Sequence, residues 1–324
     1  MRRRLLFLVA ILALAGAASP AHAVWFWGTK PLGMGTAYTG VADDNNAIQV
    51  NPAGIGRISY YSIDINYERR EYEIQDYAKL HEDDLVEEED EFDFGREFFQ
   101  ENQPEEDVHE KNISDFWHAS IVDGKTTRNV ALGVAFTAAN FPARTFNEGK
   151  DYRFHLALAG NFSDIVYLGA AGKVIQLEPG DTQFNGDFGF LVHAVDFLSI
   201  GLAGRNVFGS GDPYLVEREV ALGLAGWILD YATVSFDMTK VFDVDESNTF
   251  NFATGAEGYI YKMASTRSGL ALRGGFLWDQ IYARNNYSAG FAWIAPEGTL
   301  AYTFQGDVEN VRNFKHSIEI ALRF

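Results

Sequence analysis

Few side chains in this sequence have the types and spacing that catalysis requires. Hydrolysis needs a nucleophile or an activated water beside a positioned base. The seven histidines are scattered, and neither a G-x-S-x-G nor an H-E-x-x-H pattern occurs. Gly33-Met34-Gly35 follows no strand-like segment and lacks the third glycine of a dinucleotide-binding loop. The sequence therefore predicts that the protein is not an enzyme and uses no cofactor.

Oxygen ligands for a cation are concentrated in one acidic block, residues 82–93. Clustered carboxylates can bind Ca²⁺, but the block lacks the D-x-D-x-D-G spacing of an EF-hand loop. A run of like charges is more commonly a solvated loop, so no metal site is predicted. The chain has no cysteine, which excludes disulfides and thiolate metal sites.

The charge of the chain is strongly negative and unevenly distributed. The net charge is −19, and residues 68–114 contain 19 Asp and Glu against 5 Lys and Arg. A nucleic-acid partner needs a basic surface, which this composition does not provide. The rest of the chain is only mildly acidic, so the acidic segment is expected to be one large insertion.

The N-terminus has the features of a secretory signal peptide. Arg2, Arg3 and Arg4 precede an apolar run at residues 5–15, and Ala21-His22-Ala23 provides an A-x-A cleavage site. The apolar run is shorter than the roughly 20 residues that a transmembrane helix needs. We expect residues 1–23 to be removed after export, so that the mature chain starts at Val24.

From about residue 58 onward, side chains alternate with a period of two. Val130, Leu132 and Val134 share one face of a segment whose other face carries Ala131 and Gly133. Segments of roughly 9–11 residues are long enough for tilted strands to cross a bilayer. The pattern predicts fourteen strands, at 58–67, 115–123, 129–139, 151–162, 165–178, 184–194, 197–207, 217–228, 231–242, 248–260, 268–279, 285–295, 297–306 and 313–324.

Strands that cross a membrane must close into a barrel, because only closure satisfies every backbone group without water. Two-residue connections such as Ser163-Asp164 join adjacent antiparallel strands. A soluble sandwich also alternates, but it would not readily supply fourteen strands of this length. We therefore expect an all-β fold: a transmembrane antiparallel up-and-down β-barrel of about fourteen strands, comprising residues 58–324, in a bacterial outer membrane among lipids and lipopolysaccharide.

Short and long connections alternate along the chain, which indicates a barrel with two different ends. The two-residue turns and both chain ends should lie on the periplasmic side. Residues 68–114 then form the first external loop. Its interleaved phenylalanines leave open a second interpretation, a lid over the barrel mouth: Phe92, Phe94, Phe98 and Phe99.

Many inward positions of the predicted wall are small, so wall side chains cannot fill a lumen of this width. Examples are Gly133, Ala135, Gly201, Ala203 and Gly223. Residues 24–57, rich in glycine and alanine, are the expected plug. Polar side chains expected to face the lumen are Arg153, His155, Arg205, Asp237 and Arg273.

The plug segment contains the most specific pattern in the chain. Pro31-Leu32-Gly33-Met34-Gly35, then Asp43-Asp44, then Asn51-Pro52-Ala53-Gly54 resembles the N-terminal signature of the FadL long-chain fatty-acid transporter family, and PorV-like outer-membrane proteins begin similarly. The segments at 187–209 and 287–324, with a terminal phenylalanine typical of barrel-assembly signals, look like the same superfamily. The resemblance implies a barrel with a luminal hatch, recognised by the barrel-assembly machinery, that takes up hydrophobic molecules.

The resemblance assigns hatch or gating positions to seven residues: Gly33, Gly35, Asp43, Asp44, Asn51, Pro52 and Gly54. Asp43 and Asp44 are expected either to cap a short helix at residues 45–50 or to pair with a luminal arginine. The expected function is passive uptake of hydrophobic small molecules such as long-chain fatty acids. The alternative is a PorV-like structural or secretion-linked role, in which external loops dock partner proteins.

Overall fold

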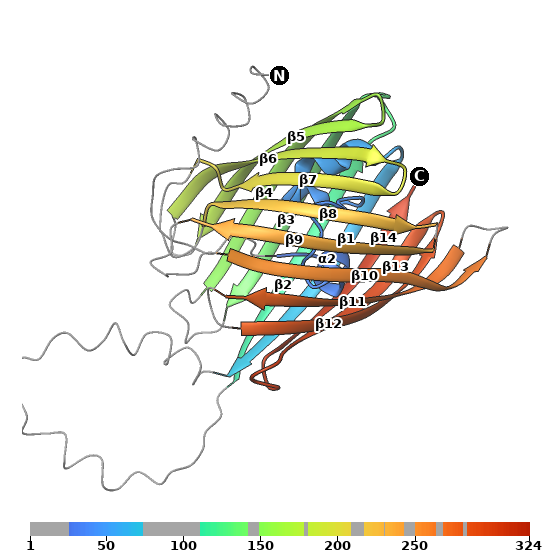
Figure 1. Ribbon diagram of the computed structural model, residues 1–324. Coiled ribbons are helices and arrows are strands. Elements are labelled where there is room, and N and C mark those ends of the chain that lie inside the picture. The colour runs from blue at the N-terminus through green and yellow to red at the C-terminus, as the bar shows by residue number, and fades with distance from the viewer. Residues whose placement is uncertain are drawn as a thin grey trace, which may run out of the picture.

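The barrel is closed and built from fourteen antiparallel strands (Figure 1). The computed structural model describes residues 26–73, 111–141, 149–177, 181–208, 217–229, 231–242, 250–263, 268–280 and 284–324. Each strand pairs with its neighbours in the sequence, and β14 closes the ring on β1. The expected signal peptide, and the acidic block with its phenylalanines, lie outside the described residues.

The strands agree in number and order with the sequence prediction. Their bounds are β1 (Tyr61–Glu73), β2 (Lys111–Asp123), β3 (Val130–Phe141), β4 (Gly149–Phe162), β5 (Val166–Leu177), β6 (Asp181–Val195), β7 (Leu198–Arg205), β8 (Glu219–Ile228), β9 (Ala232–Val241), β10 (Phe250–Met263), β11 (Ser268–Asp279), β12 (Arg284–Ala295), β13 (Gly298–Asp307) and β14 (Phe314–Arg323).

Four strands extend three residues or more beyond their predicted bounds: β1, β2, β6 and β10. The charges after Tyr67 make β1 resemble a loop, yet it remains paired with both neighbours through Glu71. Its charges are satisfied locally, since Arg70 Nε lies 2.6 Å from Glu68 Oε1. At the other side of the barrel, β10 continues past a register shift between Tyr259 and Tyr261, so its connection to β11 is shorter than predicted.

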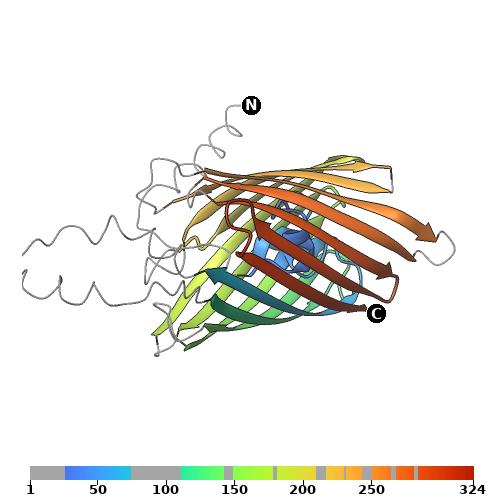
Figure 2. The same ribbon diagram turned by 90° about the horizontal axis from the view of Figure 1, so that it is seen from below.

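The two faces of the wall are chemically distinct, as β4 shows. Phe154 and Leu156, 43% and 51% exposed, point outward, whereas Arg153 and His155 are each 3% exposed and point inward. An outward apolar band with a polar interior is characteristic of transmembrane barrels. Figure 2 shows the strands running obliquely around the material that they enclose.

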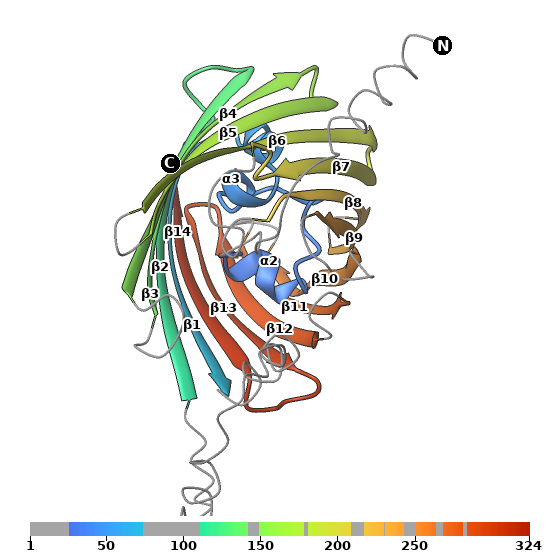
Figure 3. The same cartoon turned by 90° about the vertical axis from the view of Figure 1, so that its left-hand side faces the viewer.

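The barrel encloses its own N-terminal residues, 26–60, which we call the luminal segment (Figure 3). It contains two short helices, α2 (Thr29–Gly33) and α3 (Ala47–Val50), and a 3₁₀ turn, η1 (Pro52–Arg57). Its apolar side chains, including Met34, Tyr38 and Ile48, pack against wall alanines such as Ala135 and Ala157. In the described part of the chain, no helix is long and apolar enough to span a bilayer.

The outward face of β4 provides a test of membrane contact. Leu156→Arg near the middle of the strand should cost roughly 2–4 kcal/mol of folding free energy in lipid vesicles, because the charge enters hydrocarbon. Asn129→Arg, in an exposed turn, is the matched control and should cost little. Equal stability of the two variants in denaturant titrations would show that this face does not contact hydrocarbon.

Candidate functional site

The luminal segment is seated on three pairs of wall glycines. The pairs are Gly169 with Gly189 on β5 and β6, Gly201 with Gly223 on β7 and β8, and Gly255 with Gly275 on β10 and β11, each directly opposite across neighbouring strands. Any Cβ added at these six positions would collide with the luminal segment. Backbone therefore approaches backbone at all three seats, which only glycine permits.

Each seat receives a different part of the segment. Met34 and Gly35 lie against the Gly255 seat, Thr39 and Gly40 against the Gly223 seat, and the Asn51-Pro52-Ala53 turn against the Gly169 seat. Gly35 has a φ of 60°, in the left-handed region where glycine is favoured. Two of the sequence motifs thus contact the wall where its side chains are absent.

Wall side chains then hold the exposed backbone groups of the segment. The Asp237 carboxylate on β9 accepts hydrogen bonds from the backbone N–H groups of Tyr38 (2.9 Å) and Thr39 (2.7 Å). Ser235 Oγ donates to the Ala37 carbonyl (2.7 Å), and Thr303 Oγ1 donates to the Thr29 carbonyl (2.9 Å). These contacts fix the register of the segment within the barrel.

Asn51, Pro52 and Gly54 form one turn. Asn51 Nδ2 donates to the Thr39 carbonyl (2.9 Å) and to the Phe190 carbonyl of β6 (3.3 Å), so it joins two parts of the segment to the wall. Pro52 begins η1, and a Cβ at Gly54 would collide with Ala42. The turn therefore closes the luminal segment on itself.

Gly33 lies at the end of α2, against Arg273. A Cβ there would lie 2.8 Å from Thr303 Oγ1 and 3.2 Å from a carbon of Arg273, so glycine lets the helix rest on the wall. Gly33 and Gly35 thus lie on either side of the first contact with β11.

Asp43 forms an ionic contact within the segment and neither caps a helix nor pairs with a luminal arginine. Its carboxylate lies 2.9 Å from Lys30 Nζ, which also lies 3.5 Å from Glu257 Oε1 on β10. Burial alone would raise the pKa of the Asp43 carboxyl, but Lys30 and Arg57 bring it down to about 2. The Tyr38 hydroxyl donates to the same carboxylate at 3.0 Å.

Asp44 is placed differently from its neighbour. Its Oδ1 accepts from the Asn46 backbone N–H (2.9 Å), the residue that precedes α3, so it supports the turn into the helix without pairing with an arginine. Burial and the adjacent Asp43 raise the pKa of the Asp44 carboxyl. The surroundings therefore lower the pKa of the Asp43 carboxyl and raise the pKa of the Asp44 carboxyl.

The five expected luminal polar residues are all buried on the inner face, but they do not converge. Arg205 pairs with Glu219 (2.6 Å) and donates to the Val50 carbonyl (3.1 Å). Arg273 pairs with Glu257 (2.7 Å), near Lys30. Arg153 and His155 lie on β4, away from the groups that line the cavity described next.

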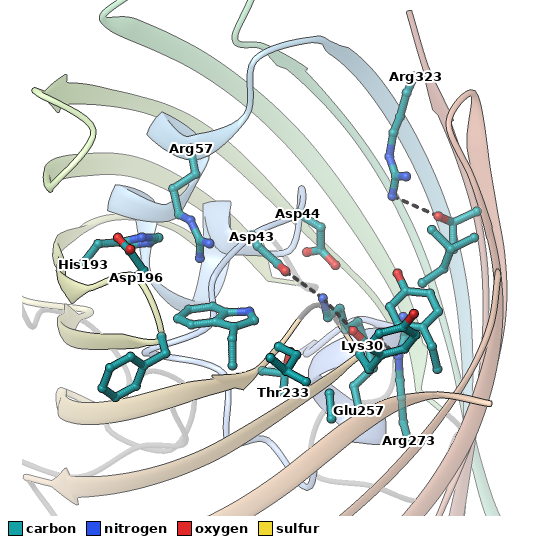
Figure 4. A pocket seen from close by; sticks show the side chains of 18 of the residues that line it. Lys30, Asp43, Asp44, Arg57, His193, Asp196, Thr233, Glu257, Arg273 and Arg323 are labelled. Carbon is teal, nitrogen blue, oxygen red and sulfur yellow. Dashed lines mark hydrogen bonds and ion pairs between the residues drawn. The ribbon is translucent and has the colours of Figure 1, made fainter. Parts of the chain in front are cut away.

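A cavity of about 750 Å³ lies beside the luminal segment at the end of the barrel that carries the two-residue turns (Figure 4). Turn residues Asp196, Phe197 and Leu229 line it, together with Lys30 and Arg57 of the segment. Charged side chains are the largest group in its lining, and Phe197, Trp227, Leu229, Ala232 and Ile294 contribute apolar surface. In the described residues, no three His, Asp or Glu side chains are placed to hold a metal ion.

Lys30 and the glycine pairs Gly169–Gly189 and Gly255–Gly275 were not among the residues singled out by the sequence, whereas Gly201 and Gly223 were expected as small inward positions of the wall. Lys30 could have been found, because Lys30, Asp43, Asp44 and Arg57 are the only charged residues in positions 24–57. Pairing of opposite charges within that small set is the simplest outcome in the barrel interior, where the effective dielectric constant is lower than that of water. The glycine pairs depend on strand register, which the sequence does not specify directly.

Substitution of a seat glycine tests its role. Gly169→Ala, Gly223→Ala or Gly255→Ala forces the segment away from the wall, so each should lose roughly 1–3 kcal/mol of stability and raise ion conductance in planar bilayers. Gly172→Ala on β5 and Gly258→Ala on β10 are matched controls, since a Cβ there meets nothing within 4 Å. Seat variants that behave like these controls would contradict the seating.

The Lys30 contact can be tested by charge removal. Lys30→Met leaves Asp43 and Glu257 without their shared ammonium, which would cost about 3–5 kcal/mol for a fully buried pair and less here, because the Asp43 side chain is 30% exposed. Hydrogen exchange in residues 26–60 should accelerate, and adding Asp43→Asn should partly reverse the effect. Lys125→Met, in an exposed turn, is the control.

The same contact gives a pH dependence. Since the folded pKa of Asp43 is below its unfolded value, its contribution is complete above about pH 5 and disappears as the pH falls toward 2. A fall in the hydrogen-exchange protection factors of residues 26–60 on acidification, seen in wild type but not in Lys30→Met, supports the contact. The same acid response in both proteins would contradict it.

Comparison with known proteins shows likeness at the level of structure. No family model matches the chain, and no curated protein matches its sequence. The Ralstonia pickettii toluene transporter TbuX is 12% identical over 92% of this chain and 98% of its own, with a TM-score of 0.60. The CymD monoaromatic hydrocarbon channel has the same identity and TM-score over 93% and 99%. A Pseudomonas aeruginosa FadL homologue is 11% identical over 94% and 98%, with a TM-score of 0.57. The chain therefore has the fold of the FadL-type transporters.

Proposed function

We propose that this protein is a passive carrier in the bacterial outer membrane that takes up hydrophobic small molecules such as long-chain fatty acids. The single observation that supports this most directly is the position of the luminal segment inside the barrel. Many inward residues of the wall are glycine or alanine, and the segment occupies the space that they leave. A plug of this kind excludes ions and water-soluble molecules from a permanent pore, while displacement of the plug opens a path.

The contacts that hold the segment are suited to reversible displacement. They consist of glycine seats, two backbone hydrogen bonds accepted by Asp237, one hydrogen bond donated by each of Ser235 and Thr303, and the contact of Lys30 with Asp43 and Glu257. The chain has no cysteine that could fix the segment covalently. A typical hydrogen bond of this kind contributes about 0.5–1.5 kcal/mol, so part of the set can open without unfolding the barrel.

The direction of transport follows from partition. An apolar solute leaves water readily, but a charged outer leaflet hinders its passage through the lipid. The barrel offers the solute a protein path across that leaflet. The cavity at the short-turn end offers it a compartment before it leaves the barrel at that end. The solved structures of similar fold include transporters named for toluene and a channel named for monoaromatic hydrocarbons, which supports a hydrophobic cargo.

A cell-based assay tests the proposal. The protein is expressed in a Gram-negative host that lacks a carrier of this kind, and uptake of a radiolabelled long-chain fatty acid and of butylbenzene is measured. We expect uptake to increase with the amount of protein in the outer membrane. The Gly172→Ala variant is a positive control, and an unrelated barrel of similar abundance is the negative control.

Uptake at the rate of the unrelated barrel would show that the carrier proposal is wrong. If a partner protein co-purified with the chain, and deletion of residues 74–110 abolished this, a docking function like that of PorV-like proteins would be favoured. The assay therefore separates the two functions.

A further inference from the structure

Three buried polar atoms of residues that line the cavity at the short-turn end have no hydrogen-bond partner among the described residues: Arg273 Nη1, Glu319 Oε2 and His193 Nε2. Arg273 Nη1 and Glu319 Oε2 are inaccessible to solvent, and neither has a hydrogen-bond partner among the described residues. Arg273 on β11 is 5% exposed and Glu319 on β14 is 3% exposed, and both line the cavity.

The rest of the Arg273 side chain is already positioned. Arg273 Nε pairs with Glu257 Oε2 at 2.7 Å, and the chain of Arg273 packs under Gly33 of α2. Leaving a buried polar atom unpaired carries a free-energy cost, and hydrogen bonds to charged groups are stronger than neutral ones. A bound group that both accepts from Arg273 and donates to Glu319 would recover this cost.

The charges around the cavity argue against a charged ligand. Four cationic side chains line it (Lys30, Arg57, Arg273 and Arg323), and five anionic ones (Asp43, Asp44, Asp196, Glu257 and Glu319). The two signs nearly cancel, so an anion or a cation would meet repulsion as well as attraction. An uncharged group with one donor and one acceptor gains from both signs.

Apolar and aromatic side chains complete the lining. Phe197, Trp227 and Leu229 lie at the ends of β7 and β8, and Tyr60 and Ile294 approach from the segment and from β12. Arg57 lies over Trp227 at 5.3 Å and holds the indole in place. A cavity of about 750 Å³ is within the range that takes a small organic molecule (Figure 4).

We propose that this cavity binds an uncharged apolar molecule with a single hydroxyl group, an alcohol or a phenol, whose hydroxyl accepts from Arg273 and donates to Glu319. The apolar body lies against Trp227, Phe197 and Ile294. This inference rests on the proposed carrier function and names one class of its cargo. The cavity would then be a binding site for that cargo along its path, on the side of the luminal segment that carries Lys30 and Arg57.

Four probes of one shape test the site. Binding of 4-butylphenol, butylbenzene, 4-butylbenzoate and 4-butylbenzylammonium to the full-length protein is measured by titration calorimetry in one detergent, after subtraction of partition into protein-free micelles. We expect the phenol to bind about tenfold more tightly than each of the others. Equal affinities of the phenol and butylbenzene, or tighter binding of either ion, would overturn the proposal.

Variants identify the residues involved. Glu319→Met and Arg273→Met should each reduce the preference for the phenol over butylbenzene about tenfold, whereas Glu319→Gln, which keeps an acceptor, should retain most of it. Glu309→Gln, an exposed carboxylate that does not line the cavity, should leave the preference unchanged. A preference that survives both methionine substitutions would overturn the assignment, and butylbenzene binding reports whether each variant is folded.

The result is separable from that of the carrier proposal. Uptake of butylbenzene without any hydroxyl preference in binding would leave the carrier function standing and remove this site. A hydroxyl preference in binding without uptake by cells would leave this binding site standing and show that the carrier function is wrong.

Discussion

The close approach of the luminal segment to the barrel wall determines much of what this molecule can do. At each of three places, two glycines on adjacent strands leave a patch of bare backbone, and the segment rests directly on it. A side chain at any of these positions would push the segment toward the centre of the lumen. The width of the barrel, the small wall residues and the glycine-rich plug are therefore consequences of one packing requirement.

Polar groups inside the barrel follow from the same arrangement. Backbone brought against backbone leaves N–H and carbonyl groups that need partners away from water. Asp237 and Ser235 supply these for residues 37–39, and Arg205 supplies one for Val50. Part of the polar lumen thus satisfies the plug, whereas Arg273 Nη1 and Glu319 Oε2 are among the buried atoms of the described residues that have no partner.

Much of the fold could be predicted from the sequence, because a two-residue period survives wherever one face of a strand meets lipid and the other meets protein. The prediction was less good where charges continued a strand, as in β1 after Tyr67, or where a register shift in β10 interrupted the alternation. In both cases the pairing of the neighbouring strand decides the outcome, and this information is not local in the chain.

The candidate site was only partly predictable for a related reason. The motifs around Gly35 and Asn51 identified the segment that contacts the wall. Of the six wall glycines that receive it, only Gly201 and Gly223 were expected at inward positions. Arg273 was expected in the lumen, whereas its partner Glu257 and the role of Lys30 came from the structure. Spacing along one strand reveals which way a side chain points, and register between strands reveals what it meets.

The central claim, that the luminal segment must move for cargo to pass, can be tested by tethering it. The Thr29 and Ser317 hydroxyl oxygens lie 2.7 Å apart, across the contact of α2 with β14, and the chain has no cysteine of its own. In the Thr29→Cys/Ser317→Cys variant, the account predicts that butylbenzene uptake stops when the disulfide forms and returns on reduction. Undiminished uptake by the fully oxidised variant would contradict it.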